Sequence, residues 1–389
     1  MINSKIYIIS FFSLIIFLTS CKTNYNVVKV DLRNKPSTKD GFYYNLPKNI
    51  IKISLDIEKQ DNIKGPYSDF AKQYFGLTNV ITQSSSNFSI KNVRVETISE
   101  IDSSQIYFVE SNDASLKINF NESGMIKDIN CVENLHSDNG NNSYKALNNN
   151  EMNNYYPSLF KKFADLNIYE KVDTILRKVK VDTAYIIEKT FKTSLVEKPI
   201  DLKAKEIVDY ISKIKEARFN LISGEIDVID KKNIEFMYQE LQNQEEQYLK
   251  LFTGITINNT NTYDFFYYPL KDTNYQITKI DICRFSSSKG ITSEEGPDIE
   301  NISLQIDYTK NLSNLFKYNQ LKNNKKKSKN GFFYRIPAIA ELRLMKNNSV
   351  IYNCQKSIAQ SGIVLSLPQK NISIKYDEKT GSIILLKIN

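Results

Sequence analysis

The sequence predicts an α+β protein in which two β-rich, sandwich-like units flank an antiparallel helical hairpin. Two patterns lead to this fold class. Near both ends of the chain, apolar and polar residues alternate with the period of two that half-buried strands have. Between residues 201 and 254 the apolar period lengthens to that of an amphipathic helix. A polar, Asn/Ser-rich stretch over residues 134–160 separates the first β-rich part from the rest of the chain.

The N-terminal residues 1–20 have the form of a lipoprotein signal peptide. Lys5 supplies a positive charge, and the almost wholly apolar run of residues 6–18 is too short to span a bilayer as a helix. The letters LTSC at residues 18–21 then match a lipobox. A plain signal peptide or a short membrane anchor is the alternative, but a plain signal peptide usually carries a small residue where Leu18 stands. We therefore expect cleavage before Cys21 and attachment of lipid to its sulfur, which would anchor the chain to a membrane.

Residues 21–40 are predicted to be a flexible tether, since they are polar and show no clear period. No acidic run comes directly after Cys21. Such a run is associated with display at the cell surface, so its absence favours the periplasmic face of the outer membrane.

The first β-rich domain is predicted over residues 41–133 and the second over residues 255–389. In the first, Ile51, Ile53, Leu55 and Ile57 lie on one face of an alternating strand. A short helix is expected over residues 66–75 and is stopped by Gly76.

The sequence GFYYNLP at residues 41–47 returns as GFFYRIP at residues 331–337, which suggests two related β-units. The repeated motif invites interpretation as a ligand site. We favour a structural role, in which the glycine permits a tight strand entry, the aromatic residues pack, and the proline ends the ladder.

Residues 161–200 alternate again and are predicted to be a β segment, and residues 201–254 form the predicted helical hairpin. Glu245 interrupts the apolar stripe of the second helix. A functional carboxylate is one interpretation. We favour a residue at the edge of the stripe that reaches solvent or a lysine.

The composition excludes several classes of chemistry. Histidine occurs once, at His136, and there is neither a nucleotide-binding glycine motif nor a Cys/His cluster at metal-ligand spacing. We therefore expect no His-based catalytic triad, no metal and no cofactor. Cys131, Cys283 and Cys354 are far apart and odd in number beside Cys21, so the sequence assigns no disulfide.

Two groups of residues are candidate ligand contacts. Tyr263, Phe266 and Tyr268 would offer aromatic platforms to a sugar, although Trp is absent and strand cores use the same residue types. Glu294 and Glu295 are part of the densest acidic group in a loop, where paired carboxylates would support hydrolysis. A polar turn is the favoured interpretation of that group.

The formal net charge of +8 is modest for 389 residues. We favour a solvated, lysine-rich surface, with contact to anionic lipid or an acidic polymer as the alternative. Nucleic acid is not expected as a partner of an exported protein.

Six segments together resemble a known family. They are, in order, GFYYNLP, GPYSDFAKQYFGL, KVDTILRKVKVDTAYI, ARFNLISGEID, EEQYLKLFTG and GFFYRIP. They are similar to an uncharacterised lipoprotein family of Bacteroidota, known as a domain of unknown function, over residues 41–389. The resemblance implies a protein of the cell envelope and brings no catalytic residues.

The expected function is therefore a non-catalytic one. We expect a lipid-anchored lipoprotein on the periplasmic face of the outer membrane that binds or scaffolds other envelope components. The first alternative is a glycan- or peptidoglycan-binding lipoprotein, and the second is a carboxylate-dependent hydrolase.

The lipobox makes a direct prediction. Mass spectrometry of the protein isolated from its native cells is expected to find Cys21 as the acylated N-terminal residue, with the protein in the membrane fraction. An unmodified Cys21 in a protein recovered from the soluble fraction would contradict the anchor.

Overall fold

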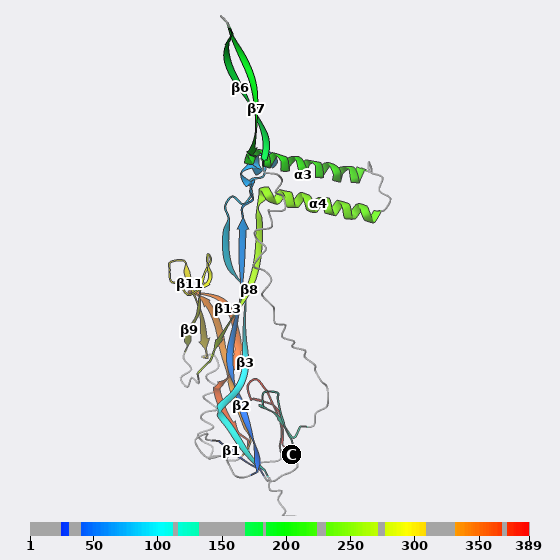
Figure 1. The fold of residues 1–389 in the computed structure, drawn as a ribbon. Coiled ribbons are helices and arrows are strands. Elements are labelled where there is room, and N and C mark those ends of the chain that lie inside the picture. The colour runs from blue at the N-terminus through cyan, green and yellow to red at the C-terminus, as the bar shows by residue number, and fades with distance from the viewer. Residues whose placement is uncertain are drawn as a thin grey trace, which may run out of the picture. The chain divides into compact units, whose positions relative to one another are not determined.

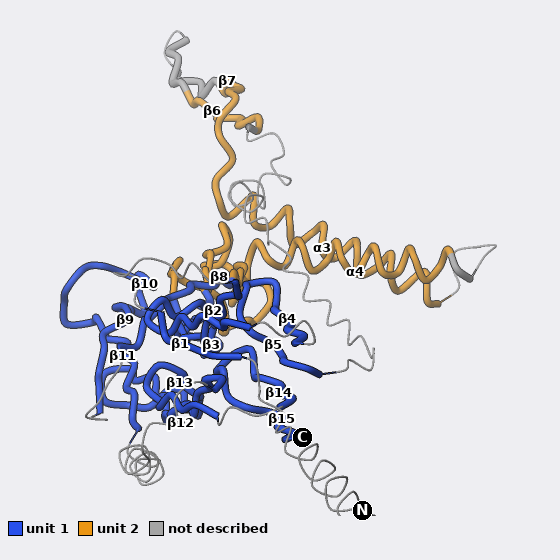
Figure 2. Tube along the Cα trace, turned by 90° about the horizontal axis from the view of Figure 1, so that it is seen from below, with its two compact units in different colours: residues 1–58, 88–137, 260–389 blue, residues 59–87, 138–259 orange. Residues whose placement is uncertain are grey.

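The structure, a computed structural model, is mostly antiparallel β-sheet with few helices (Figure 1). It describes residues 25–30, 40–111, 116–131, 168–181, 184–223, 231–270, 277–308, 331–367 and 372–388. The chain divides into two compact units (Figure 2). Unit 1 comprises residues 1–58, 88–137 and 260–389, and unit 2 comprises residues 59–87 and 138–259.

Within the described ranges, unit 1 contains three sheets, whose strand orders are β1-β3-β2-β8, β10-β9-β11-β12-β13 and β15-β14-β5-β4. The strands are β1 (Tyr25–Lys29), β2 (Gly41–Ile63), β3 (Ser85–Ser111), β4 (Ile118–Phe120), β5 (Ile126–Ile129), β8 (Ile255–Tyr267), β9 (Thr278–Ser286), β10 (Gly290–Thr292), β11 (Ile299–Asp307), β12 (Phe333–Lys346), β13 (Ser349–Ser366), β14 (Ile372–Tyr376) and β15 (Ile383–Ile388). The first residues of β3, the last residues of β2 and the first residues of β8 belong to unit 2.

The largest hydrophobic core of unit 1 lies between the first two of these sheets. The row predicted on β2 is confirmed, since Ile51, Ile53 and Leu55 are fully buried. They pack in one cluster with residues of the other sheet such as Leu304 on β11 and Leu342 on β12. Alternation of period two therefore places one face of β2 against the opposite sheet, as sandwich packing requires.

The second core of unit 1 is aromatic and brings the two copies of the repeated motif together. Tyr44 from the first copy and Phe332 from the second are fully buried, with ring centroids 6.0 Å apart. The backbone N–H of Phe333 donates a hydrogen bond to the hydroxyl of Tyr44 over 2.8 Å. The aromatic residues of the motif thus pack, as the structural interpretation of the repeat expects. The expectation that the proline ends the ladder is wrong, since β2 continues beyond Pro47 and β12 beyond Pro337.

The same core is covered by a sheet built from both ends of the chain. Strand β5 pairs with β14, with Ile129 opposite Ile374. Both side chains are fully buried. Strands from residues 41–133 and from residues 255–389 therefore share one sheet.

Unit 2 combines a small helical core with a two-stranded ribbon. Its elements are the 3₁₀ helix η1 (Ser68–Phe70), α2 (Ala71–Phe75), the strands β6 (Ile168–Val181) and β7 (Ala184–Glu197), α3 (Ile200–Ser223) and α4 (Lys231–Thr253). Gly76 ends α2 in the left-handed conformation, with a φ of 68°, and its N–H bonds the carbonyl of Lys72 over 3.0 Å. The predicted helix stop is confirmed at this glycine.

Helices α3 and α4 lie side by side in both views (Figure 1, Figure 2). The predicted stripe of α3 is buried at Ala204, Ile207 and Ile211, which form a core with Leu251 and Phe252 of α4. Residues 224–230, which would join the helices as a hairpin, lie outside the described residues, so the hairpin connection stays a prediction.

Several predicted segments also lie outside the described residues. They are the signal peptide and Cys21, residues 22–24 and 31–39 of the tether, and the Asn/Ser-rich linker over residues 134–160 with His136. Residues 25–29 of the predicted tether are instead the strand β1, because their backbone pairs with β3 and the side chains of Tyr25 and Val27 are buried. Within the part of the chain that the structure describes, none of the helices combines the length and the apolar character that a membrane crossing needs.

A glycine at the contact between the motif copies makes the fold testable. Gly381 has a φ of +70°, and an added Cβ would lie 2.8 Å from Cδ of Pro47. We expect Gly381→Ala to lower the free energy of unfolding by about 2–3 kcal/mol, since it adds a steric clash to an unfavourable backbone conformation. Urea denaturation followed by tyrosine fluorescence measures the change.

Gly124→Ala is the matched control, because Gly124 has a φ of +75° but nothing within 4 Å of the added Cβ. This variant should lose only about 1 kcal/mol. Equal losses for the two variants would show that the contact at Pro47 does not constrain the fold.

Candidate functional site

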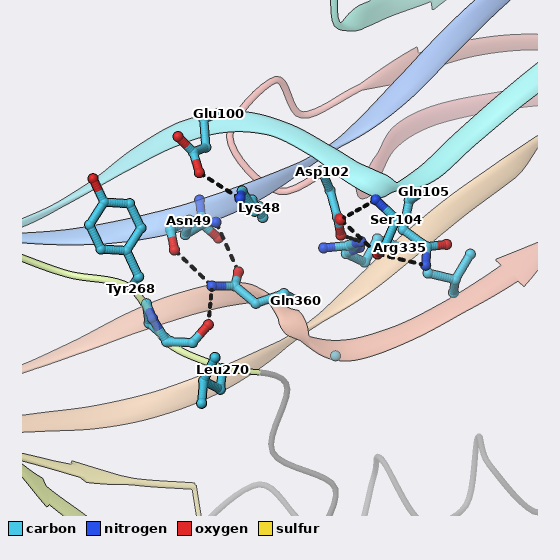
Figure 3. Close-up of a pocket in the computed structure, with 13 residues that line it drawn as sticks. Lys48, Asn49, Glu100, Asp102, Ser104, Gln105, Tyr268, Leu270, Arg335 and Gln360 are labelled. Carbon is cyan, nitrogen blue, oxygen red and sulfur yellow. Dashed lines mark hydrogen bonds and ion pairs between the residues drawn. The ribbon is translucent and has the colours of Figure 1, made fainter. Parts of the chain in front are cut away.

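A polar hollow of about 270 Å³ in unit 1 is the candidate site (Figure 3). It is lined by side chains from β2, β3, β12 and β13, and by the segment that comes after β8. Its volume is slightly below the usual range for small-molecule sites. A hollow of this volume can hold part of a larger ligand.

An irregularity in the pairing of β12 with β13 shapes this hollow. Ile336 pairs with Ile363, but Ala338 pairs with Ile358, so residues 359–362 of β13 bulge opposite Pro337. Proline has no N–H to donate to the ladder, which is why it is found at such bulges. The bulge includes Gln360, which contributes its side-chain amide to the hollow.

A buried ion pair forms the floor of the site. Arg335 is 2% exposed, and its Nη2 lies 2.7 Å from the Oδ2 of Asp102. Its Nη1 donates to the carbonyl oxygen of Pro47 over 2.8 Å. The Nε of Arg335 is buried and has no hydrogen-bond partner among the described residues. One arginine of β12 therefore ties together β3 and β2, and keeps one donor unused.

The ion pair keeps Asp102 ionised. Burial by itself would raise the pKa of Asp102, but hydrogen bonds from Arg335 and Ser104 outweigh it and hold this pKa below its ordinary value. Ser104 donates to Oδ1 of Asp102, from its backbone N–H over 2.9 Å and from its hydroxyl over 2.7 Å. Asp102 is thus a fixed anion at neutral pH, unsuited to donating a proton.

An amide network forms the wall beside this floor (Figure 3). Asn49 and Gln360 exchange hydrogen bonds: the N–H of Asn49 donates to Oε1 over 2.8 Å, and Nε2 donates to the Asn49 carbonyl over 2.7 Å. Nε2 of Gln360 also donates to the carbonyl of Pro269 over 3.0 Å. The amide groups are therefore held in place before any ligand arrives.

A second ion pair lies at the more open side. Nζ of Lys48 is 2.7 Å from Glu100, and both side chains are more than a third exposed. The hydrogen bond with Glu100 raises the pKa of Lys48. Together the two ion pairs leave the hollow polar, with its opposite charges matched.

Comparison with known families shows to which family the chain belongs. A family described as a domain of unknown function (DUF4831) matches residues 40–161 and 166–384. The chain belongs to this family. No curated protein and no solved structure matches it.

Of the aromatic residues predicted to contact a ligand, one lies at the hollow of this DUF4831 protein. Tyr268 lines it and is 58% exposed. Tyr263 and Phe266 lie on β8 with exposed fractions of 39% and 54%. Nζ of Lys52 lies 6.0 Å from the centroid of the Phe266 ring. The three side chains are therefore available to solvent, but only Tyr268 is placed with the polar groups of the site.

The predicted acidic group lies in a loop and does not line the hollow. Arg284 donates to Oε1 of Glu295 over 2.6 Å, and Lys289 pairs with Glu294. Each carboxylate has its own cation, and both are well exposed. This arrangement agrees with the favoured interpretation as a polar turn.

Glu245 meets one alternative of the favoured expectation, since its carboxylate reaches a lysine. The residue is only 8% exposed, so the other alternative, solvent, is not met. It lies 2.7 Å from Arg218 and 3.6 Å from Lys215, both on α3. The 3.6-residue period places Glu245 within the stripe, and the cations of the neighbouring helix make its burial tolerable.

Three cysteines of the described chain are free thiols, namely Cys131, Cys283 and Cys354. Burial raises the pKa of Cys283 to about 12, so this thiol is protonated at neutral pH. Across the described residues, no three or more His, Cys, Asp or Glu side chains gather as a metal site would require.

Sequence reasoning missed Asp102, Arg335 and Gln360. One signal was present: the second copy of the motif carries Arg335 where the first carries Asn45. A charged residue inside an otherwise aromatic and aliphatic motif predicts a buried counter-charge, because an unpaired buried charge is costly.

Removing the carboxylate of Asp102 tests how much its ion pair with Arg335 stabilises the protein. Asp102→Asn leaves Arg335 buried without an anion, so the free energy of unfolding at pH 7 should fall by about 3–5 kcal/mol. The folded pKa of Asp102 lies below its ordinary value of 3.8. The carboxylate therefore stabilises the protein fully above that value, and this contribution is lost as the pH falls through the folded pKa.

The difference between wild type and Asp102→Asn should thus be constant around neutral pH and shrink below about pH 4. Urea denaturation at several pH values measures it. Glu295→Gln is the control, since it breaks an exposed ion pair and should cost no more than about 1 kcal/mol. Similar costs for both variants, or a difference that persists in acid, would contradict the assignment.

Proposed function

We propose that this DUF4831 protein is a lipid-anchored lipoprotein of the bacterial envelope that binds other envelope components without catalysing a reaction. The lipobox ending at Cys21 supports the anchor. The lack of an acidic run after Cys21 supports the periplasmic face of the outer membrane. The anchor at Cys21 would then stand only four residues before β1, which pairs with β3 and is part of the folded body presented to the periplasm.

The hollow in unit 1 carries the proposal of a binding function. Its polar groups are fixed by one another, as in the exchange between Asn49 and Gln360 and in the pair of Arg335 with Asp102. Such preorganisation lowers the entropy lost when a ligand is bound.

The same contacts support a non-catalytic role. General acid–base work needs one group that gives a proton and one that takes it near neutral pH. Asp102 has a lowered pKa and is held by Arg335, and Glu100 is paired with Lys48. Both carboxylates at the hollow are thus engaged by cations, and nothing there favours the hydrolase over a binding protein.

A saccharide is the second candidate for the ligand, and Tyr268 favours it. This ring is 58% exposed at the edge of a hollow that offers amide groups and ion pairs. Side-chain amides and carboxylates pair with sugar hydroxyls, and an exposed aromatic face packs on the apolar face of a sugar ring. A glycan- or peptidoglycan-binding lipoprotein would use this combination.

Site-specific photocrosslinking tests the proposal in native membranes. A photoreactive amino acid replaces Tyr268 in one variant and Tyr263 in the control. We expect the first to capture one reproducible protein or glycan species, and the second to capture much less, because only Tyr268 lies at the hollow. Absence of a reproducible product from position 268, or equal capture from both positions, would contradict a binding role of the hollow.

Binding of soluble peptidoglycan fragments distinguishes the saccharide candidate. Isothermal titration should show affinity for the wild type and about tenfold weaker affinity for Tyr268→Ala, which corresponds to about 1.4 kcal/mol. Tyr263→Ala should bind as the wild type does. Conversion of the fragments, detected by mass spectrometry, would overturn the non-catalytic assignment.

A further inference from the structure

The ribbon of β6 and β7 in unit 2 is packed against no second sheet that the described part of the chain provides. Among the described residues these strands form a two-stranded sheet of their own, in register from Ile168 opposite Glu197 to Val181 opposite Ala184. Two-stranded ribbons are at best marginally stable alone in water, and a long one gains stability when an apolar face is covered.

One face of this ribbon is apolar. Four large side chains on it are more than half exposed: Val172 at 56%, Leu176 at 60%, Phe191 at 66% and Leu195 at 66%. The register places all four on the same face, since directly paired residues share a face and side chains alternate along each strand. Among the side chains described on the opposite face, Ile175 is large, apolar and exposed, at 41%. A contiguous apolar face of this kind marks a contact surface.

The pattern on this face is complementary to itself. Each paired level carries one apolar and one small or charged residue, and the apolar residue alternates between the two strands. Consider a second ribbon packed on this face and related to the first by a two-fold axis that is perpendicular to the strands. If the axis passes between the levels of Val172 and Thr174, Thr193 of the second copy lies over Phe191, and its Thr174 lies over Val172. Large side chains would then lie over small ones, as close packing between two sheets requires.

The charges on the face fit the same arrangement. Glu170 lies at the level of Leu195, and Lys189 lies at the level of Leu176, on the other side of the axis. Turning a second copy end for end brings its Glu170 to the level of Lys189, and the reverse contact forms by symmetry. The face carries charges of both signs, since Glu170 shares it with Lys189, which suits a copy of itself better than a surface of one charge.

We propose that the β6–β7 ribbon is a self-association surface, at which two copies of the chain pack these faces together with their ribbons antiparallel. The face between the levels of Glu170 and Leu176 and their partners is about 200 Å² per copy, from ordinary strand dimensions. Stable dimers bury about 800 Å² per partner, so the association is weak and depends on concentration.

Sedimentation velocity of the full chain in detergent micelles, with micelles in excess, tests this surface over a wide concentration range. The wild type is expected to shift from monomer to dimer as its concentration rises. Phe191→Asp, on the apolar face, should weaken the dimer at least tenfold. Ile175→Asp, on the opposite face of the same ribbon, should leave it unchanged. A monomer at every concentration, or a dimer that tolerates Phe191→Asp, would overturn the proposal.

Exchanging the charges of two residues on the face distinguishes self-association from binding of another molecule and from unfolding of the ribbon. Lys189→Glu should weaken the dimer, and the double variant Lys189→Glu with Glu170→Lys should restore it. Binding of the face to a lipid surface or to an unrelated protein would not be restored by this exchange. Failure of the double variant to dimerise overturns the antiparallel arrangement, and vesicle binding that is lost in Phe191→Asp while the protein stays monomeric would assign the face to lipid.

Discussion

A single buried cation joins the strands that make up the candidate site. Arg335 contacts the carboxylate of Asp102 on β3 and the carbonyl of Pro47 on β2, and its backbone N–H donates to the carbonyl of Gly381 over 2.8 Å. Burying a guanidinium costs several kcal/mol unless its charge is balanced and its donors are bonded. The positions of β2, β3 and β12 around it are therefore constrained by this residue as well as by the apolar contacts nearby.

The aromatic core of unit 1 strengthens the ion pair of Arg335 with Asp102. Tyr44 and Phe332, from the two copies of the motif, exclude water from the region beside the ion pair. Stacking of Tyr107 on Phe333, with ring centroids 4.3 Å apart, continues the same layer. In a dry environment the attraction between Arg335 and Asp102 is stronger than it would be at the surface, and so is the cost of losing either partner.

Unit 2 is stabilised by other contacts than unit 1. Its core is small and joins α3 and α4 to the short helix α2, and the pair of Glu245 with Arg218 adds a buried charge between the long helices. The β6–β7 ribbon has no such core among the described residues, and its most exposed apolar side chains share one face. An apolar face in water gains stability when it is covered, and the proposed self-association would cover this one.

The sequence by itself determined the local elements of this DUF4831 protein. Period two on residues 51–57, the helical stripe from Ala204 and the stop at Gly76 depend only on neighbours along the chain, so they were predictable. Of the candidate site it found Tyr268. Only the tertiary structure decided that Asp102 meets Arg335, 233 residues away, and that both copies of the motif share one core. Contacts of this kind are set by strand pairing and by the need to neutralise buried charge, which no local pattern encodes.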